Sequence, residues 1–159
     1  MTLSIRPGEL ADVPVIAELI RALARYEKLD QEVVMTEEKL TDSLFGERPY
    51  AETLIAEDDG EPVGFALFFH NYSTFLAQPG IYLEDLFVKP EHRGAGVGKM
   101  LLERLAQLAV DRGCGRLEWA VLDWNVDAIR FYERLGAKPN AEWTVYRLTG
   151  KPLQRLAGE

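Results

Sequence analysis

Residues 93–99 read Arg-Gly-Ala-Gly-Val-Gly-Lys and lie between an apolar run and a long amphipathic pattern. Three glycines at alternate positions leave this stretch of backbone uncovered by side chains. The first N–H groups of a helix have no partner within the helix, and together with the helix dipole they favour an anion. A helix that begins here would therefore bind a phosphate or a pyrophosphate. The alternative is a glycine-rich turn that only begins a helix.

The segment matches neither of two common nucleotide-binding patterns. A P-loop requires Gly-x-x-x-x-Gly-Lys-Ser/Thr, but Met100 follows Gly98 and Lys99. A dinucleotide fingerprint requires Gly-x-Gly-x-x-Gly, but Lys99 and Leu101 occupy the positions where the last glycine would be needed. The pattern that remains is Arg-x-x-Gly-x-Gly after a strand.

The spacing of apolar residues predicts the elements that position this segment. The predicted strands cover residues 3–6, 53–57, 62–70, 81–88, 116–122 and 143–148. The predicted helices cover residues 12–26, a segment that begins at 36, and residues 96–112 and 127–135. This order predicts one layered α/β domain over residues 1–159 with a mixed sheet.

Composition limits the classes of function. The chain has 159 residues and a net charge of −8, which argues against a nucleic-acid partner and is compatible with a small cationic substrate. No apolar run approaches the roughly 18 residues of a membrane span, and no signal peptide is recognisable. Cys114, His70 and His92 offer neither a disulfide nor a metal-ligand cluster, and Cys114 lacks a basic partner pattern. We therefore expect a cytoplasmic protein without a metal, in which Cys114 is a packed residue.

Five blocks in order resemble the diamine (spermidine/spermine) and thialysine N-acetyltransferase branch of the GNAT family. The blocks are Ala24-Arg25-Tyr26-Glu27, Tyr82-Leu83-Glu84-Asp85-Leu86-Phe87-Val88, the glycine segment, Ala120-Val121-Leu122-Asp123-Trp124-Asn125 and Phe131-Tyr132-Glu133-Arg134-Leu135-Gly136-Ala137. The resemblance covers about residues 5–148. It implies the GNAT fold, an α/β (α+β) arrangement with a mixed central sheet of about six to seven strands. Helices would cover both faces, and the central strands 81–88 and 116–122 would splay apart.

The resemblance also implies a site for acetyl-CoA, whose thioester would lie between the splayed strands. The backbone that would bind the pantetheine arm, like an added strand, belongs to Leu86, Phe87 and Val88. The residues of the pyrophosphate signature are Arg93, Gly94, Gly96, Val97, Gly98 and Lys99. The far end of the cofactor would contact residues 125–128, including Asn125 and Ala128. Asn125 precedes a predicted helix and would also be its N-cap.

Under this resemblance the chain must accept a proton from its amine substrate. An amine attacks only when neutral, and at pH 7 neutralising a lysine-like amine of pKa about 10.4 costs roughly 4.6 kcal/mol. Glu84 is the candidate acceptor, directly or through a water, and Asp85 lies on the opposite face of the strand unless a bulge turns it. Tyr132 would protonate the departing thiolate of coenzyme A, as the matched position does in the family. The alternatives are a solvated strand end for the two carboxylates and a core aromatic for Tyr132.

The positions that match substrate contacts of the family are Tyr26, Glu27, Glu84, Asp85 and Glu142. Residues 72–75 read Tyr-Ser-Thr-Phe and are similar to the thialysine-type enzymes, although phenylalanine replaces their tryptophan. We therefore expect a small ω-amino substrate such as a lysine analogue, with a diamine or polyamine second.

Two other functions stay open. The domain could bind acyl-CoA without turnover as a sensor, although the presence of both a proton acceptor and Tyr132 argues against this. It could also acetylate protein lysines, which would need an open peptide groove. The resemblance further implies a homodimer, and we expect neither a nucleic-acid nor a membrane partner.

Overall fold

The structure is a computed structural model and describes residues 2–159. The chain divides into two compact units, Met1–Ala120 and Val121–Glu159, and each is described by itself. Within residues 2–159, none of the helices combines the length and the apolar composition needed to cross a membrane.

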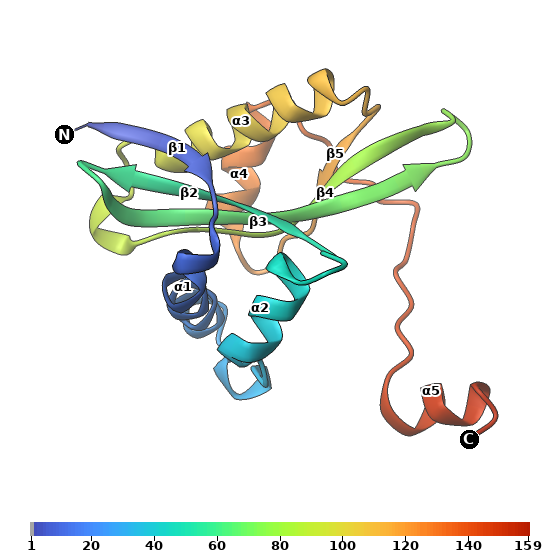
Figure 1. Ribbon diagram of the computed structural model, residues 1–159. Coiled ribbons are helices and arrows are strands. Elements are labelled where there is room, and N and C mark those ends of the chain that lie inside the picture. The colour runs from blue at the N-terminus through green and yellow to red at the C-terminus, as the bar shows by residue number, and fades with distance from the viewer. Residues whose placement is uncertain (1) are drawn as a thin grey trace. The chain divides into compact units, whose positions relative to one another are not determined.

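The first unit is built on a five-stranded sheet with the strand order β1-β2-β3-β4-β5 (Figure 1). The first four strands pair antiparallel, and β5 is parallel to β4. The strands are β1 (Leu3–Pro7), β2 (Glu52–Asp58), β3 (Glu61–Ser73), β4 (Gln78–Val88) and β5 (Leu117–Trp119). The predicted mixed sheet is therefore confirmed, with five strands in place of six to seven.

The turn between β2 and β3 has the chemistry that a tight hairpin needs. Asp59 and Gly60 both have positive φ angles, +52° and +83°. A two-residue hairpin loop favours such a turn because its twist matches that of the strands. The break that the sequence predicts between the strands 53–57 and 62–70 is confirmed.

The hairpin between β3 and β4 is longer than the sequence predicts. The predicted strands cover residues 62–70 and 81–88, whereas β3 extends to Ser73 and β4 begins at Gln78. A Cβ atom at Gly80 would collide with the side-chain oxygen of Asn71, its partner on β3. Gly80 thus leaves room for the Asn71 side chain.

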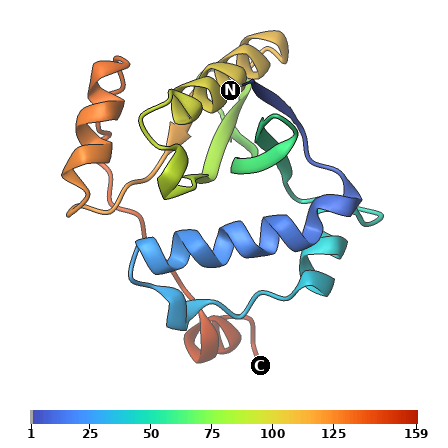
Figure 2. The same cartoon turned by 90° about the vertical axis from the view of Figure 1, so that its left-hand side faces the viewer.

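Helices cover both faces of the sheet, as expected (Figures 1 and 2). α1 (Val13–Tyr26) and α2 (Glu37–Phe45) lie on one face, and α3 (Val97–Asp111) lies on the other. Three short 3-10 helices occur in the connections, η1 (Leu10–Asp12), η2 (Asp30–Glu32) and η3 (Pro90–His92). The largest fully buried side chains are those of Ile16, Leu19, Ile55, Val63, Phe65, Phe68, Ile81, Leu101 and Leu105.

The second unit contains α4 (Val126–Arg134) and α5 (Gly150–Leu156). The prediction of a strand over residues 143–148 is wrong, since the described chain forms no ladder there and Trp143 and Tyr146 are 76% and 92% exposed. Alternating apolar residues favour a strand, but a strand forms only where a neighbouring edge accepts its hydrogen bonds. The sequence did not predict α5.

Candidate active site

A bulge interrupts β4 at Glu84. Leu67 of β3 pairs with Asp85, and the next residue, Phe68, pairs with Leu83, so Glu84 has no partner on β3. An extra residue of this kind bends the strand and breaks the strict alternation of side chains. Because the alternation is broken here, the adjacent side chains of Glu84 and Asp85 can reach the same side of the sheet.

Three carboxylates form an acidic cluster, which consists of Glu27, Glu84 and Asp85. Burial, followed by the negative charges of Glu84 and Glu27, raises the pKa of half-buried Asp85 from 3.8 to about 7. Burial and the charge of Glu84 also raise the pKa of Glu27. The cluster therefore holds a proton on Asp85 for much of the time at neutral pH, and an added cation would favour its release.

The end of α1 places Glu27 in this cluster. Lys28 has a φ of +63°, and its N–H donates to the carbonyl of Arg25, while the N–H of Leu29 donates to the carbonyl of Ala24. This is a Schellman ending, in which a left-handed residue stops the helix and satisfies its last carbonyls. A lysine in a conformation that favours glycine makes this ending strained.

Arg93 connects the glycine segment to the acidic side of the unit. Its Nε donates to the Val88 carbonyl at 3.0 Å, and its guanidinium lies 4.7 Å from the ring centre of Tyr26 and 5.3 Å from that of Phe87. The side chain thus supports the loop from three directions. The Arg-x-x-Gly-x-Gly motif identified Arg93 as a candidate site residue. Nothing in the neighbouring sequence indicated its contacts with Tyr26 and Phe87.

The glycine segment has the backbone that an anion site requires. Gly94 and Gly96 have φ angles of +85° and +86°, and α3 begins directly after Gly96. Met100 is the first residue whose N–H bonds back into this helix, to the Gly96 carbonyl, so the N–H groups of residues 97–99 have no helical partner. Val97 itself is buried, and its side chain anchors the segment in the interior.

Gly98 is not required by internal packing. A Cβ atom at this position would meet only the Val88 side chain, at an ordinary 3.9 Å. A glycine inside a helix costs roughly 0.5–1 kcal/mol relative to alanine, so its presence needs another reason. Space for a bound group in front of the helix is such a reason.

The pairing of β4 with β5 ends early. Leu83 opposite Trp119 is the last pair, while β4 continues to Val88. Between these points β4 pairs only with β3, so its other edge is open within the first unit. The opening agrees with the splayed strands expected from the sequence, and residues 86–88 have no strand partner on that side.

Four predicted site residues lie in the second unit. Asn125 accepts a hydrogen bond from the N–H of Ala128 at 3.3 Å, which confirms its predicted role as an N-cap. Tyr132 is half-buried on α4, with its ring 5.6 Å from that of Phe131. Glu142 is exposed outside any helix or strand. Contacts of these four residues with coenzyme or amine stay predictions.

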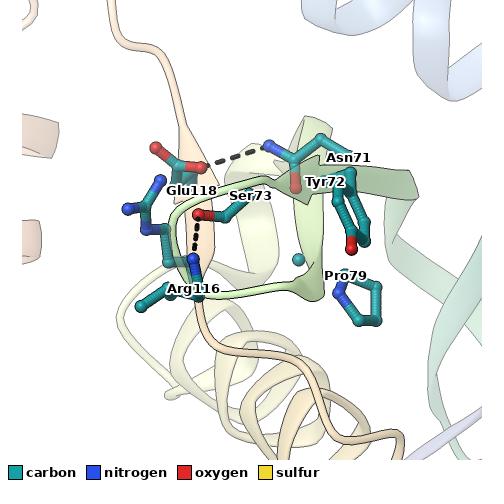
Figure 3. A pocket seen from close by; sticks show the side chains of 8 residues that line it. Asn71, Tyr72, Ser73, Pro79, Arg116 and Glu118 are labelled. Atoms are coloured by element: carbon teal, nitrogen blue, oxygen red, sulfur yellow. Dashed lines mark hydrogen bonds between the residues drawn. The ribbon is translucent and has the colours of Figure 1, made fainter.

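A hollow beside the β3–β4 hairpin lies next to residues 72–75, where the sequence suggested substrate selection (Figure 3). It measures only about 10 Å³, which is room for a single water molecule. Asn71 donates to Glu118 across it at 3.1 Å, and Phe75 is 96% exposed. The hollow is too small to hold an amine substrate.

Cys114 has a basic neighbour that the sequence did not reveal. Its sulfur lies 3.9 Å from Nδ1 of His70. Nδ1 is 3.0 Å from the Gly80 carbonyl, which only accepts, and Nε2 is 3.0 Å from a guanidinium nitrogen of Arg112, which only donates. His70 thus uses Nδ1 towards the Gly80 carbonyl and Nε2 towards Arg112, so neither ring nitrogen is left to activate the thiol. Within residues 2–159 no group of three or more metal-ligating side chains is placed to bind a metal ion.

Comparison with known proteins places this geometry in context. The model of the acetyltransferase (GNAT) family matches residues 16–137, a range that crosses the boundary between the two units. The thialysine N-epsilon-acetyltransferase of Bos taurus is 42% identical over 166 residues, which cover 98% of this chain and 97% of the relative. An L-ornithine N5-acetyltransferase of Arabidopsis thaliana is 36% identical over 197 residues, which cover 96% of this chain and 86% of the relative. An integron cassette protein from the mobile metagenome of V. cholerae has a similar structure, with a TM-score of 0.83 and 27% identity over 100% of this chain and 99% of that one.

Proposed function

Because this chain belongs to the acetyltransferase (GNAT) family, we propose that it moves the acetyl group of acetyl-CoA to the primary amine of a small ω-amino compound. The observation that carries the proposal is that one unit holds both a glycine-rich anion site and an acidic cluster beside an open strand edge. The first suits a pyrophosphate, and the second suits a cationic amine.

The residues of the glycine segment fit the diphosphate of coenzyme A. The N–H groups of residues 97–99 would donate to it, and the two left-handed glycines before them leave the approach open. The absent Cβ of Gly98 leaves room for the same group. Arg93 holds the segment against β4 through the Val88 carbonyl, and the backbone of residues 86–88 on the open edge of β4 would bind the pantetheine arm. Bound acetyl-CoA supplies an activated acetyl thioester, and Asn125 and Ala128 would contact its far end.

The acidic cluster would bind the ammonium group and accept its proton. Glu84, at the bulge, is exposed and is the proposed acceptor, directly or through a water. Asp85 and Glu27 would hold the cation, and a pKa near 7 lets Asp85 ionise when the cation arrives. Glu84 thereby provides the acceptor for a proton whose removal from a lysine-like amine costs roughly 4.6 kcal/mol at pH 7.

Tyr132 would donate its proton to the departing thiolate. A thiol with a pKa of about 8.5 is already a fair leaving group, so the contribution of this acid is near the lower end of the 10²–10⁴ range. The half-buried position of Tyr132 on α4 is compatible with this role. Tyr26 and Glu142 are proposed as further contacts of the amine.

A lysine analogue is the proposed substrate, with a diamine or polyamine second. Thialysine and ornithine, the substrates in the names of the two relatives, both carry an α-carboxylate and a terminal amine. The deciding experiment incubates the protein with acetyl-CoA and a panel of thialysine, lysine, ornithine, putrescine and spermidine, and follows the release of free thiol. We expect turnover of thialysine first. The matched variants are Glu84→Gln, which should lose activity, and Glu103→Gln on the exposed side of α3, which should not.

The same assay separates the alternatives. Binding of acetyl-CoA in a calorimeter without turnover of any amine would favour a sensor, and turnover only of a lysine peptide would favour a protein acetyltransferase. No binding of acetyl-CoA at millimolar concentration would refute the whole proposal. We further propose one family domain over residues 1–159, a cytoplasmic location, a homodimer, and no metal, nucleic-acid or membrane partner. The resemblance supports the dimer, and size-exclusion chromatography with light scattering tests it.

A further inference from the structure

A second groove lies on the outer side of α1, away from the glycine segment. It has a volume of about 200 Å³ and is lined by Arg21, Arg25, Asp30, Val33 and Met35. The segment that follows α1 runs back along this helix before α2 begins (Figure 2). The lining residues of the groove come from α1 and from this segment. Its lining comes entirely from residues that lie close together in the chain.

The groove is distinct from the acidic cluster. Successive residues of an α-helix are rotated by about 100°, so Arg25 and Glu27 are about 200° apart around the axis of α1. Arg21 lies one turn before Arg25 on the same face. A ligand in the groove would therefore occupy the side of α1 opposite to the carboxylate that faces Glu84.

Two positive charges with no internal counterpart form one wall. Arg21 and Arg25 are both exposed, and none of the ion pairs found among residues 2–159 involves either of them. A guanidinium group donates two parallel N–H groups, which match the two oxygens of a carboxylate. This wall indicates an anionic group in the ligand.

The other lining residues, Asp30, Val33 and Met35, restrict which anionic ligand can bind. Asp30 places a carboxylate in the same groove, which would repel a phosphate dianion and attract an ammonium group. Val33 and Met35 are half-buried, and Met35 packs against the apolar core, so they provide an apolar floor. A carboxylate, an ammonium group and a short apolar chain occur together in an α-amino acid.

We propose that this groove binds a small apolar α-amino acid as a zwitterion. Its carboxylate is held by Arg21 and Arg25, its ammonium group by Asp30, and its side chain by Val33 and Met35. The volume of the groove suits a molecule of this size. The site is separate from the one that we propose for the acetylated amine.

The test uses L-norvaline as the probe, because it has no terminal amine and cannot be acetylated there. Binding is measured by calorimetry on the full chain and on Arg21→Gln/Arg25→Gln, Asp30→Asn and the control Arg48→Gln, whose arginine is exposed elsewhere. We expect the double variant to lose at least about tenfold in affinity and the control to lose none. Loss of two surface charges should leave the fold intact, and the thermal unfolding curve verifies this.

Pentanoate and pentylamine separate the two halves of the recognition. Pentanoate should bind more weakly than norvaline and respond to the arginine variants but not to Asp30→Asn. The affinity for pentylamine should be the same in the arginine double variant as in the wild type. The proposal is overturned if norvaline fails to bind at millimolar concentration, or if its affinity is the same in the double variant. Neither result bears on the acetyl-transfer assay, which uses different ligands and the acidic cluster.

Discussion

Replacing Asp85 by asparagine should change stability in a manner that depends on pH. Asp85 has a pKa of about 7 in the folded protein and about 3.8 when unfolded, because burial and two neighbouring carboxylates disfavour its charge. Between these values the folded chain holds a proton that the unfolded chain has lost. The free energy of unfolding of the wild type therefore falls as pH rises from about 4 to about 7, and levels off above that.

The structure sets the size of this effect. The difference between 3.8 and about 7 corresponds to an upper limit of about 4 kcal/mol, at 1.36 kcal/mol per pKa unit. The effect on the free energy of unfolding is smaller than this limit, because water reaches the half-buried group and Glu27 and Glu84 can move slightly. We therefore expect about 2 kcal/mol. Asp85→Asn removes the charge and keeps the shape. The variant should thus be about 2 kcal/mol more stable than the wild type at pH 8 and nearly equal to it at about pH 3, below the unfolded pKa.

Urea unfolding at about pH 3 and pH 8 measures both values. Asp111→Asn, at the exposed end of α3, is the matched control and should show no such difference between the two pH values. In the amine assay Asp85→Asn should raise the KM of the amine, because one of the charges that hold the cation is lost. If Asp85→Asn changed the free energy of unfolding by the same amount at both pH values, the account of the acidic cluster would be refuted. A change caused only by altered packing does not depend on pH.

Three further substitutions test other parts of the reasoning. Gly98→Ala should increase the free energy of unfolding by roughly 0.5–1 kcal/mol, because alanine favours a helix and its Cβ meets no obstacle. The same variant should bind acetyl-CoA more weakly in a calorimeter; unchanged affinity would contradict the pyrophosphate site. Tyr132→Phe should lower kcat at pH 7 by about 10²-fold with little change in KM, and an unchanged kcat would remove its role as an acid. Lys28→Gly should stabilise the protein by up to about 1 kcal/mol in urea unfolding, whereas Lys39→Gly within α2 should destabilise it by a similar amount.

Local features were predictable because a few neighbouring residues create them. The turn at Asp59 and Gly60 requires positive φ angles that these residue types adopt readily. Thr36 accepts a hydrogen bond from the N–H of Lys39 and begins α2, as its position before the helix predicted. The family fold followed from five blocks in order, and the matched range of residues 16–137 confirms the family.

Interactions between distant segments were not predictable in this way. The bulge at Glu84 depends on how β3 and β4 align over their whole length, and no property of Glu84 itself demands it. The contact of Arg93 with Tyr26 and the contact of His70 with Arg112 also join segments that are far apart in the chain. The strand predicted over residues 143–148 does not form for the same reason, because a strand depends on a neighbouring strand whose edge accepts its hydrogen bonds.

The amino-acid sequence by itself determined the family, the glycine-rich beginning of α3 and the identity of the carboxylates. These depend on residue types at short spacings, where the backbone has few alternatives. Only the tertiary structure decided that Glu27, Glu84 and Asp85 lie close enough to hold one proton between pH 4 and pH 7. Charges interact over distances in space and through the surrounding medium, and folding alone determines both.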